Sequence, residues 1–296
     1  MRTSRRDSSV DFGRERTDAA CLGLPLRSHP LLLLPARLQP SHAAGPVIAV
    51  TGAGPAMAGK VVLITGSTSG IGAATARIFA AAGCHLVLNS RTSVSAGGQL
   101  VTELPAARYV QGDVADPEDC QRMAEAALET WGRLDVVVNN AATTTFVAHD
   151  DLRAATPEIW RRIFDVNVLG AWNVISASVE ALRRSEGAII NITSVAGSRP
   201  GGSSIPYAVS KAALNHLTAL LALTLGPEIT VNAVAPGLID TPWTFGLDDA
   251  RDVVEQTAPL RRIGTAEDVA QVCLAVAQMR YTTGEVFLVD GGMHLT

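Results

Sequence analysis

The chain has 296 residues, of which 47% are hydrophobic and 18% charged, and its formal net charge at pH 7 is −4. This length allows one large α/β domain or two small ones, and the negative charge gives no reason to expect a nucleic-acid partner. No apolar run approaches the roughly 18 residues of a membrane helix, so no membrane partner is expected. The four cysteines lack metal-binding spacing, which indicates reduced thiols in a cytoplasmic protein and no metal site.

The first 56 residues differ from the rest of the chain. They contain seven arginines, four acids and scattered prolines, with no sustained apolar period. The run LLLL at 31–34 is short for a signal peptide and lies far from the start, and the acids argue against a transit peptide. We expect a poorly structured extension whose removal reduces neither activity nor thermal stability. Met57 opens MAGKVVLITG, which is typical of a natural start and suggests that translation was extended upstream.

A Thr-Gly pair follows a short apolar run twice, at 51–52 and at 65–66. A phosphate-binding loop leads directly into a helix, because the first N–H groups of a helix are unpaired and carry partial positive charge. No helix fits in PAMAGK after the first pair, whereas STSGIGAATARIFAAAG after the second is rich in helix formers and ends at Gly83. The second pair therefore predicts the phosphate loop, in which three glycines permit a tight turn and close backbone approach: Gly66, Gly70 and Gly72.

Strands and helices alternate from this loop onward. The run VVLIT at 61–65 is typical of a buried parallel strand. Further strands are predicted at 85–90, 108–113, 134–140, 188–193, 229–235 and 285–290. Helices are predicted from Pro117 to Trp131, from Pro157 to about Arg184, from Pro206 to about Leu225, and after a start signal at 265–268. Seven strands in residues 57–296 predict a single α/β domain, a doubly wound, Rossmann-type parallel sheet with helices on both faces.

Polar residues stand where these strands end. Because ligands bind at the carboxyl ends of the strands in such sheets, we expect the functional site along that edge. The residues at these ends are Asp113, Asn139, Asn140, Thr193, Ser194, Pro236 and Gly237.

Tyr207 and Lys211 lie four residues apart in one predicted helix, which places both on the same helix face. A lysine beside a tyrosine favours the phenolate and lowers the pKa of the tyrosine toward neutrality, so that it can act as a general acid or base. Taken alone, the pair is most simply an exposed surface pair. The chain has only two lysines against 22 arginines, which weakens that explanation.

Six motifs together resemble those of the short-chain dehydrogenases/reductases, from about Met57 to the C-terminus. Ser194 and Tyr207 stand thirteen residues apart, as in that family. One motif departs slightly, because the family's usual Asn-Asn-Ala-Gly ends in Ala142 here. The motifs are TGSTSGIG (65–72), NNAA (139–142), Asn167 in DVNVLG, Ser194 in NITSVAG, YAVSK (207–211) and VNAVAPGLIDTP (231–242).

The resemblance implies the role of each catalytic residue. Tyr207 exchanges a proton with the substrate oxygen, Ser194 hydrogen-bonds that oxygen, and Lys211 holds the nicotinamide ribose and tunes Tyr207. Asn167 anchors a water that links Lys211 to solvent. This arrangement is physically reasonable, since hydride addition to a carbonyl creates an oxyanion that needs a donor and a proton source. The implied cofactor-binding residues are Gly66, Ser69, Gly70, Ile71, Gly72, Ser90, Arg91, Asp113, Val114, Asn140, Tyr207, Lys211, Pro236, Gly237, Ile239 and Thr241.

The end of the second predicted strand favours NADP(H) over NAD(H). An NAD enzyme usually has an acid there to bind the adenosine ribose, and that acid would repel a 2′-phosphate. Here Ser90 occupies the position and Arg91 follows, and both can bind phosphate. No acid occurs between Gly83 and Thr102, so nothing nearby opposes the phosphate. The alternative is that Arg91 points into solvent and both cofactors are accepted.

The predicted function is NADP-dependent interconversion of a carbonyl and a secondary alcohol, and the sequence looks most like the 3-oxoacyl-acyl-carrier-protein reductases. The alternatives are an NAD-dependent alcohol, sugar or sterol dehydrogenase, or a non-catalytic dinucleotide sensor, a class that typically lacks the Tyr/Lys pair. Enoyl reductases space these two residues further apart. The loops 143–158 and 197–206 and the segment after Thr241 are expected to select the small-molecule substrate, with 240–254 as a lid.

A homotetramer or homodimer is also expected. The predicted helix at 206–225 is apolar around much of its circumference, so that one face packs on the sheet and another is left for a partner subunit. The apolar residues are Ala212, Leu214, Leu217, Leu220, Leu221 and Leu223.

Overall fold

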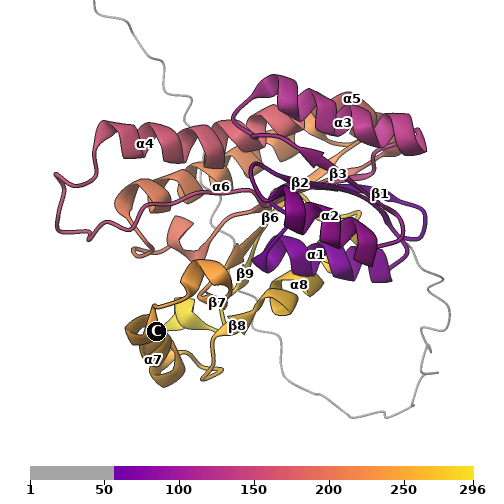
Figure 1. Ribbon diagram of the computed structural model, residues 1–296. Coiled ribbons are helices and arrows are strands. Elements are labelled where there is room, and N and C mark those ends of the chain that lie inside the picture. The colour runs from indigo at the N-terminus through magenta and orange to yellow at the C-terminus, as the bar shows by residue number, and fades with distance from the viewer. Residues whose placement is uncertain (1–56) are drawn as a thin grey trace, which may run out of the picture. The chain divides into compact units, whose positions relative to one another are not determined.

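The computed structural model describes residues 57–296, so the predicted extension 1–56 lies outside the described residues. The chain forms a seven-stranded parallel sheet in the order β3-β2-β1-β4-β5-β6-β9 (Figure 1). Every predicted strand is found within one or two residues of its expected bounds, and the predicted fold class is confirmed. The strands are β1 (Val61–Ile64), β2 (His85–Ser90), β3 (Ala107–Gln111), β4 (Val136–Asn139), β5 (Ala188–Ile192), β6 (Thr230–Pro236) and β9 (Val286–Val289).

Helices cover both faces of this sheet. One face carries α1 (Gly70–Ala81), α2 (Val94–Glu103) and α8 (Ala266–Gln278). The other carries α3 (Pro117–Trp131), α5 (Gly170–Ser185) and α6 (Ile205–Leu225). Beyond the sheet edge lie α4 (Pro157–Phe164), α7 (Asp248–Thr257) and a two-stranded sheet of β7 (Ile239–Asp240) and β8 (Gly264–Thr265).

The core explains why the strand sequences are apolar without alternation. Successive side chains of a strand point to opposite faces, and both faces of this sheet are covered. Val62 and Ile64 of β1 pack with α1 and α8, whereas Val61 and Leu63 pack with α3 and α5. All four are fully buried. Each such side chain contributes about 1.5–3 kcal/mol of transfer free energy, which favours a place for β1 in the interior of the sheet, between β2 and β4.

Two helical regions differ from the sequence prediction. The helix predicted from Pro157 to Arg184 is divided by a π-helical segment, Asp165–Leu169, between α4 and α5. Helix α2 was not predicted, because its sequence VSAGGQLVTE contains two adjacent glycines. Gly97 is required there by packing, since a Cβ atom on it would lie 2.7 Å from the ring carbon Cζ of Tyr109 on β3.

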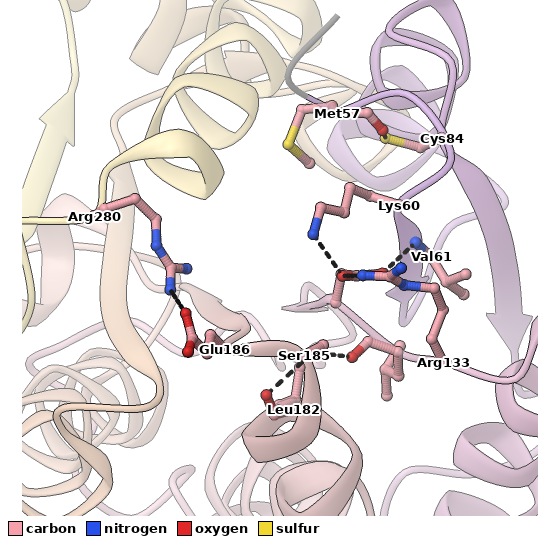
Figure 2. A network of polar contacts seen from close by, with 11 residues as sticks. Met57, Lys60, Val61, Cys84, Arg133, Leu182, Ser185, Glu186 and Arg280 are labelled. Atoms are coloured by element: carbon pink, nitrogen blue, oxygen red, sulfur yellow. Dashed lines mark hydrogen bonds and ion pairs between the residues drawn. The ribbon is translucent and has the colours of Figure 1, made fainter.

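A carboxylate ties the amino-terminal edge of the sheet together, and Figure 2 shows Lys60, Val61 and Arg133 around it. Asp135 accepts hydrogen bonds from Lys60 Nζ at 2.9 Å, from Val61 N at 2.9 Å and from Arg133 Nε at 2.7 Å. Burial raises the pKa of Asp135, but these three donors outweigh burial and the net pKa is lowered. The carboxylate therefore joins β1 to the segment that opens β4.

We expect Asp135→Asn to lower the free energy of unfolding by about 2 kcal/mol at pH 7, because an amide cannot satisfy three donors. The cost stays below that of a fully buried pair, since Lys60 and Arg133 keep 36% and 45% of their side-chain exposure. A carboxyl whose pKa is lower when folded stabilises above its unfolded pKa, and this is lost as pH falls through the folded value. Urea unfolding should therefore show a difference that shrinks progressively as the pH falls below about 4 and is lost below the folded pKa of Asp135. A constant difference down to pH 2 would contradict this assignment.

Candidate active site

The glycine loop joins β1 to α1 at the carboxyl edge of the sheet. Gly66 and Gly70 have φ angles of 61° and 50°, in the left-handed region that favours glycine. Gly72 lies in the first turn of α1, and a Cβ there would lie against the Gly66 carbonyl oxygen and 2.6 Å from Asn140 Nδ2. Ser69 is the N-cap of α1 but makes no side-chain capping bond. The loop therefore leaves backbone N–H groups and the Ser69 hydroxyl at the helix N-terminus for an anionic ligand.

Two asparagines and a threonine hold this loop in place. Asn140 Nδ2 donates to the carbonyl oxygens of Thr65 and Gly66, both at 2.9 Å. Thr65 Oγ1 accepts in return from Asn140 N at 3.1 Å and Ala141 N at 3.0 Å. Asn89 Nδ2 donates to the Val110 and Gly112 carbonyl oxygens, which fixes the end of β2 against the end of β3. Asn89 was not predicted, because an asparagine inside an apolar strand shows its partners only in the folded chain.

Ser194, Tyr207 and Lys211 meet where β5 ends and α6 begins. Lys211 Nζ donates to the Ile192 carbonyl oxygen at 2.8 Å and lies 5.7 Å from the centroid of the Tyr207 ring. Ser194 Oγ accepts from Ala196 N at 3.1 Å, which fixes the hydroxyl in a short 3-10 turn, Val195–Gly197. Ser204 caps α6 and so sets the position of Tyr207 in its first turn. The predicted trio is brought together as its spacing indicated.

The pKa of Tyr207 differs from the prediction. Burial raises the pKa of Tyr207 to about 12, with a smaller opposite effect from a hydrogen bond to Ser194. Burial lowers the pKa of Lys211 to about 8. The expected lowering of the Tyr207 pKa by Lys211 is not found. Removal of the phenolate from water destabilises it by more than the Lys211 charge stabilises it at this distance. Without ligands, Tyr207 is therefore a protonated acid at neutral pH.

Asn167 lies in the π-helical segment, under the floor of the site. Its side chain accepts from Thr143 N at 2.8 Å and donates to Thr143 O and Ser210 Oγ, both at 3.0 Å. These bonds hold the loop after β4 against α6. The side chain is buried and does not border the cleft described next, so its predicted water-anchoring role stays a prediction.

These elements enclose a cleft of about 1420 Å³ along the carboxyl ends of the strands. Of the predicted catalytic and cofactor-binding residues, only Gly72 and Asn167 do not border it, and of the predicted strand-end residues Asn139 does not. The predicted substrate segments 143–158 and 240–254 also form walls of the cleft, and Met293 adds a residue that was not predicted. Phe146, Trp243, Leu247 and Met293 make one end apolar, and the Trp243 ring lies 6.3 Å from that of Tyr207. The predicted lid, 240–254, comprises a 3-10 turn at Pro242–Thr244 and α7, and both border this end.

The other end of the cleft carries the residues predicted to select the cofactor. The Ser90 hydroxyl is hydrogen-bonded to the Tyr109 hydroxyl at 2.8 Å, and Arg91 is 57% exposed. The expectation that no acid lies near Arg91 is wrong, because Asp113 Oδ2 lies 3.7 Å from the Arg91 guanidinium. Asp113 lies outside the segment between Gly83 and Thr102, and the parallel pairing of β2 and β3 brings it close to Arg91.

The whole cleft fits a dinucleotide. Phosphates fit the glycine loop, where a Cβ at residue 72 would fill the space that Gly66 and Asn140 occupy. Arg91 provides a cation at the end of β2, where the adenosine ribose of such a ligand would lie, and Tyr207 and Lys211 lie beside the apolar end of the same cleft. Within residues 57–296, no group of three or more His, Cys, Asp or Glu side chains could hold a metal ion.

Comparison with known proteins agrees with this geometry. A family model described as enoyl-(acyl carrier protein) reductase matches residues 66–294. The chain is 51% identical over 239 residues to a protein of Streptomyces violaceoruber named as ketoacyl reductase 2 of the granaticin polyketide synthase, covering 79% of this chain and 96% of the relative. It is 37% identical over 244 residues to a 3-oxoacyl-acyl-carrier-protein reductase of Thermotoga maritima, covering 79% and 98%.

Solved structures have the same fold. One is a short-chain dehydrogenase/reductase of Burkholderia xenovorans, with a TM-score of 0.76 at 31% identity, covering 80% of this chain and 99% of the other. Another is the protein ElxO with NADP bound, with a TM-score of 0.74 at 29% identity, covering 80% and 100%. These similarities span about as much of the chain as the six sequence motifs do.

Proposed function

Because the chain belongs to the short-chain dehydrogenase/reductase family, whose members act on carbonyl and alcohol groups, we propose that it is an NADP-dependent oxidoreductase interconverting a carbonyl and a secondary alcohol. The observation that carries the proposal is the position of Ser194, Tyr207 and Lys211. All three border the cleft, between the glycine loop and the apolar end of the cleft. A dinucleotide sensor would need no buried proton donor there. The four-residue spacing of Tyr207 and Lys211 favours a carbonyl over an enoyl substrate.

The protein's own residues supply the proton chemistry. When bound, the nicotinamide supplies the hydride. The Ser194 hydroxyl and the Tyr207 phenol donate hydrogen bonds to the substrate oxygen and stabilise the negative charge that develops on it. Tyr207 then gives up its proton to that oxygen. With a pKa of about 12, Tyr207 holds this proton until the oxygen becomes strongly basic, and the Lys211 cation stabilises the phenolate that is left.

Most of the predicted cofactor residues lie on elements suited to the parts of NADP(H). The glycine loop with Ser69, Gly70 and Ile71 would hold the pyrophosphate at the N-terminus of α1. Lys211, Asn140 and the turn at Pro236–Gly237 would surround the nicotinamide ribose. Ser90 and Arg91 would bind the 2′-phosphate, and a structural neighbour with NADP bound supports this choice.

For the substrate, we propose the 3-oxoacyl class, in which the keto group is carried on an apolar chain. The apolar end of the cleft beside Tyr207 would receive such a chain. Relatives named as ketoacyl and 3-oxoacyl reductases support this substrate class. The test is a panel of 3-oxoacyl thioesters, simple ketones, sugars and sterols with NADPH and NADH. Turnover of 3-oxoacyl thioesters with NADPH at least ten times faster than of the other classes is expected. Turnover of a sterol or sugar with NADH alone would favour the alternative dehydrogenase.

We expect Arg91→Ala to reduce the ratio of kcat/KM for NADPH to that for NADH by about 10- to 100-fold, because the variant loses a charge-assisted bond to the 2′-phosphate alone. NADH kinetics should change little, since NADH has no group at that position. The measurement is initial-rate kinetics with both cofactors on the wild type and the variant. A wild-type preference for NADH, or an unchanged ratio, would refute the cofactor proposal and leave the family assignment standing.

We also propose that the enzyme is a soluble, cytoplasmic homotetramer or homodimer. Among the described helices, only α6 is long and apolar enough to cross a membrane, but its Leu214 and Leu221 are buried against the sheet side of the molecule. Its opposite face exposes Val209, Leu220 and Leu223, and the neighbouring helical segments expose Leu169 and Trp172. An apolar surface of this kind is typical of a subunit interface.

Light scattering at micromolar concentration should therefore show an oligomer in the wild type. The double substitution Leu220→Glu and Leu223→Glu should shift it to a smaller species, because the new charges would lose hydration at the interface. Asp249→Ala on the exposed part of α7 is a control. A wild-type monomer would contradict the proposal.

A further inference from the structure

Three charged side chains from separate elements meet at the adenosine end of the cleft. Asp113 Oδ2 lies 3.7 Å from Arg91 Nη1 and 3.6 Å from Arg162 Nη2. Arg91 follows β2, Asp113 follows β3, and Arg162 lies in the last turn of α4. All three border the cleft, so the same carboxylate oxygen faces two guanidinium groups at the surface where a ligand would lie.

The Asp113 carboxylate is fixed in this position by its own loop. Its Oδ1 accepts a hydrogen bond from Ala115 N at 3.0 Å, and its backbone N donates to Asp119 Oδ2 at 2.6 Å. The side chain is 27% exposed. The carboxylate therefore cannot turn away from the cleft without breaking its bond to Ala115 N, and its charge is balanced by its neighbours in this position.

The net charge of these three side chains determines how strongly a phosphate would bind. Arg91 and Asp113 alone would form a neutral pair, in which the carboxylate attracts Arg91 and repels a phosphate. Arg162 adds a second cation, so the group of three carries a net positive charge. Because Arg162 also attracts the shared Asp113 Oδ2, the electrostatic attraction between Asp113 and Arg91 is weaker. Neither guanidinium is within hydrogen-bonding distance of the oxygen, so Arg91 keeps its donors for another acceptor.

We propose that Arg162 is a positioning residue for cofactor selection: it neutralises Asp113 and thereby leaves Arg91 free to bind the 2′-phosphate of NADP(H). The inference rests on the proposed NADP dependence and adds a residue from α4 to it. Arg161, the preceding residue, provides a contrast. It is 70% exposed, pairs with Glu158 on the surface of α4 and does not border the cleft.

The experiment measures binding of NADP⁺ and NAD⁺ to the full-length, substrate-free enzyme by isothermal titration calorimetry. Arg162→Gln should weaken NADP⁺ binding by about 10-fold, the effect of one charge-assisted contact, and change NAD⁺ binding by less than about twofold. Arg161→Gln, the matched control, should change neither. Melting temperatures of both variants should lie close to that of the wild type, which excludes misfolding.

A second background separates positioning from direct contact. Asp113→Asn removes the charge that Arg162 is proposed to neutralise. Asp113 could also contact the adenine, which NADP⁺ and NAD⁺ share. Loss of such a contact would weaken both cofactors equally, so it does not change the ratio of the NADP⁺ affinity to the NAD⁺ affinity. In this background, Arg162→Gln should change that ratio by less than about threefold, since Arg91 is already free. A 10-fold effect in both backgrounds would overturn the positioning role in favour of a direct phosphate ligand.

An unchanged NADP⁺ affinity in the Arg162→Gln variant would also overturn the inference. That result is distinct from failure of the proposed function, which would appear as tighter binding of NAD⁺ than of NADP⁺ by the wild type. If NADP⁺ remains preferred and Arg91→Ala reduces the preference while Arg162→Gln leaves it unchanged, the proposed function stands and the role of Arg162 is refuted.

Discussion

Replacing Tyr207 by Phe is expected to lower kcat by about 1,000-fold or more, while the fold and the affinity for NADP(H) stay close to those of the wild type. Loss of general acid catalysis alone costs about 10²- to 10⁴-fold, and the variant also loses one of two donors to the developing oxyanion. The ring itself is retained, so its contact with Trp243 at 6.3 Å and its place over Lys211 are preserved.

The Tyr207→Phe experiment needs single-turnover rates and a cofactor titration on the same preparation. Tyr281→Phe is the matched control, because Tyr281 is fully exposed and lies away from the cleft, and it should behave as the wild type. Near-normal turnover in Tyr207→Phe would remove Tyr207 from the catalytic assignment. Lost cofactor binding would show instead that the phenol hydroxyl holds the dinucleotide.

Replacing Gly72 by Ala should raise the dissociation constant for NADP(H) by about 100-fold and lower the free energy of unfolding by about 1–3 kcal/mol. The new methyl group would lie 2.6 Å from Asn140 Nδ2 and 2.9 Å from Ser67 Cα, closer than real Cβ contacts. Asn140 would have to give up its bonds to the Thr65 and Gly66 carbonyl oxygens. The loop would then lose the shape that receives the pyrophosphate, although Gly72 does not itself border the cleft.

Gly98→Ala is the control for this substitution. Gly98 lies in α2, has open space at its Cβ position and is exposed, so alanine there should stabilise the helix by about 0.5–1 kcal/mol. Chemical denaturation and a fluorescence titration with NADPH measure both effects. Equal stability and equal affinity in Gly72→Ala and the wild type would mean that the loop adapts, against the packing described above.

Local sequence was sufficient for the seven strands of the main sheet and for the chemistry held within one element, but not for α2 or for the π-helical segment between α4 and α5. The run VVLIT reads as a strand because both sheet faces are covered, and Tyr207 and Lys211 share a face because four residues make about one helical turn. The predicted phosphate loop at 65–72 leads directly into α1, as its sequence indicated, whereas the pair at 51–52 lies outside the described residues. In each case the pattern that carries the prediction lies in one short stretch of the chain, although the helices that cover the strand come from distant segments.

Contacts between distant segments were not accessible in this way. The Asn89 side chain joins two strand ends, and Gly97 of α2 makes room for Tyr109 of β3, so neither has a local signature. Burial also reversed the expected direction of the Tyr207 pKa shift. Desolvation depends on all the atoms packed around the ring and not only on the lysine one helical turn away.

The sequence by itself determined the doubly wound fold, the phosphate loop, the Tyr/Lys pair and the choice of NADP, because each depends on a short segment and a period. Only the tertiary structure decided what surrounds Arg91. It brought Asp113 and Arg162 to the same corner from β3 and α4, and so placed an acid where the sequence showed none and a second cation beside it. Coulomb interactions act through space at a few ångströms, and the distance between residues along the chain says little about that separation.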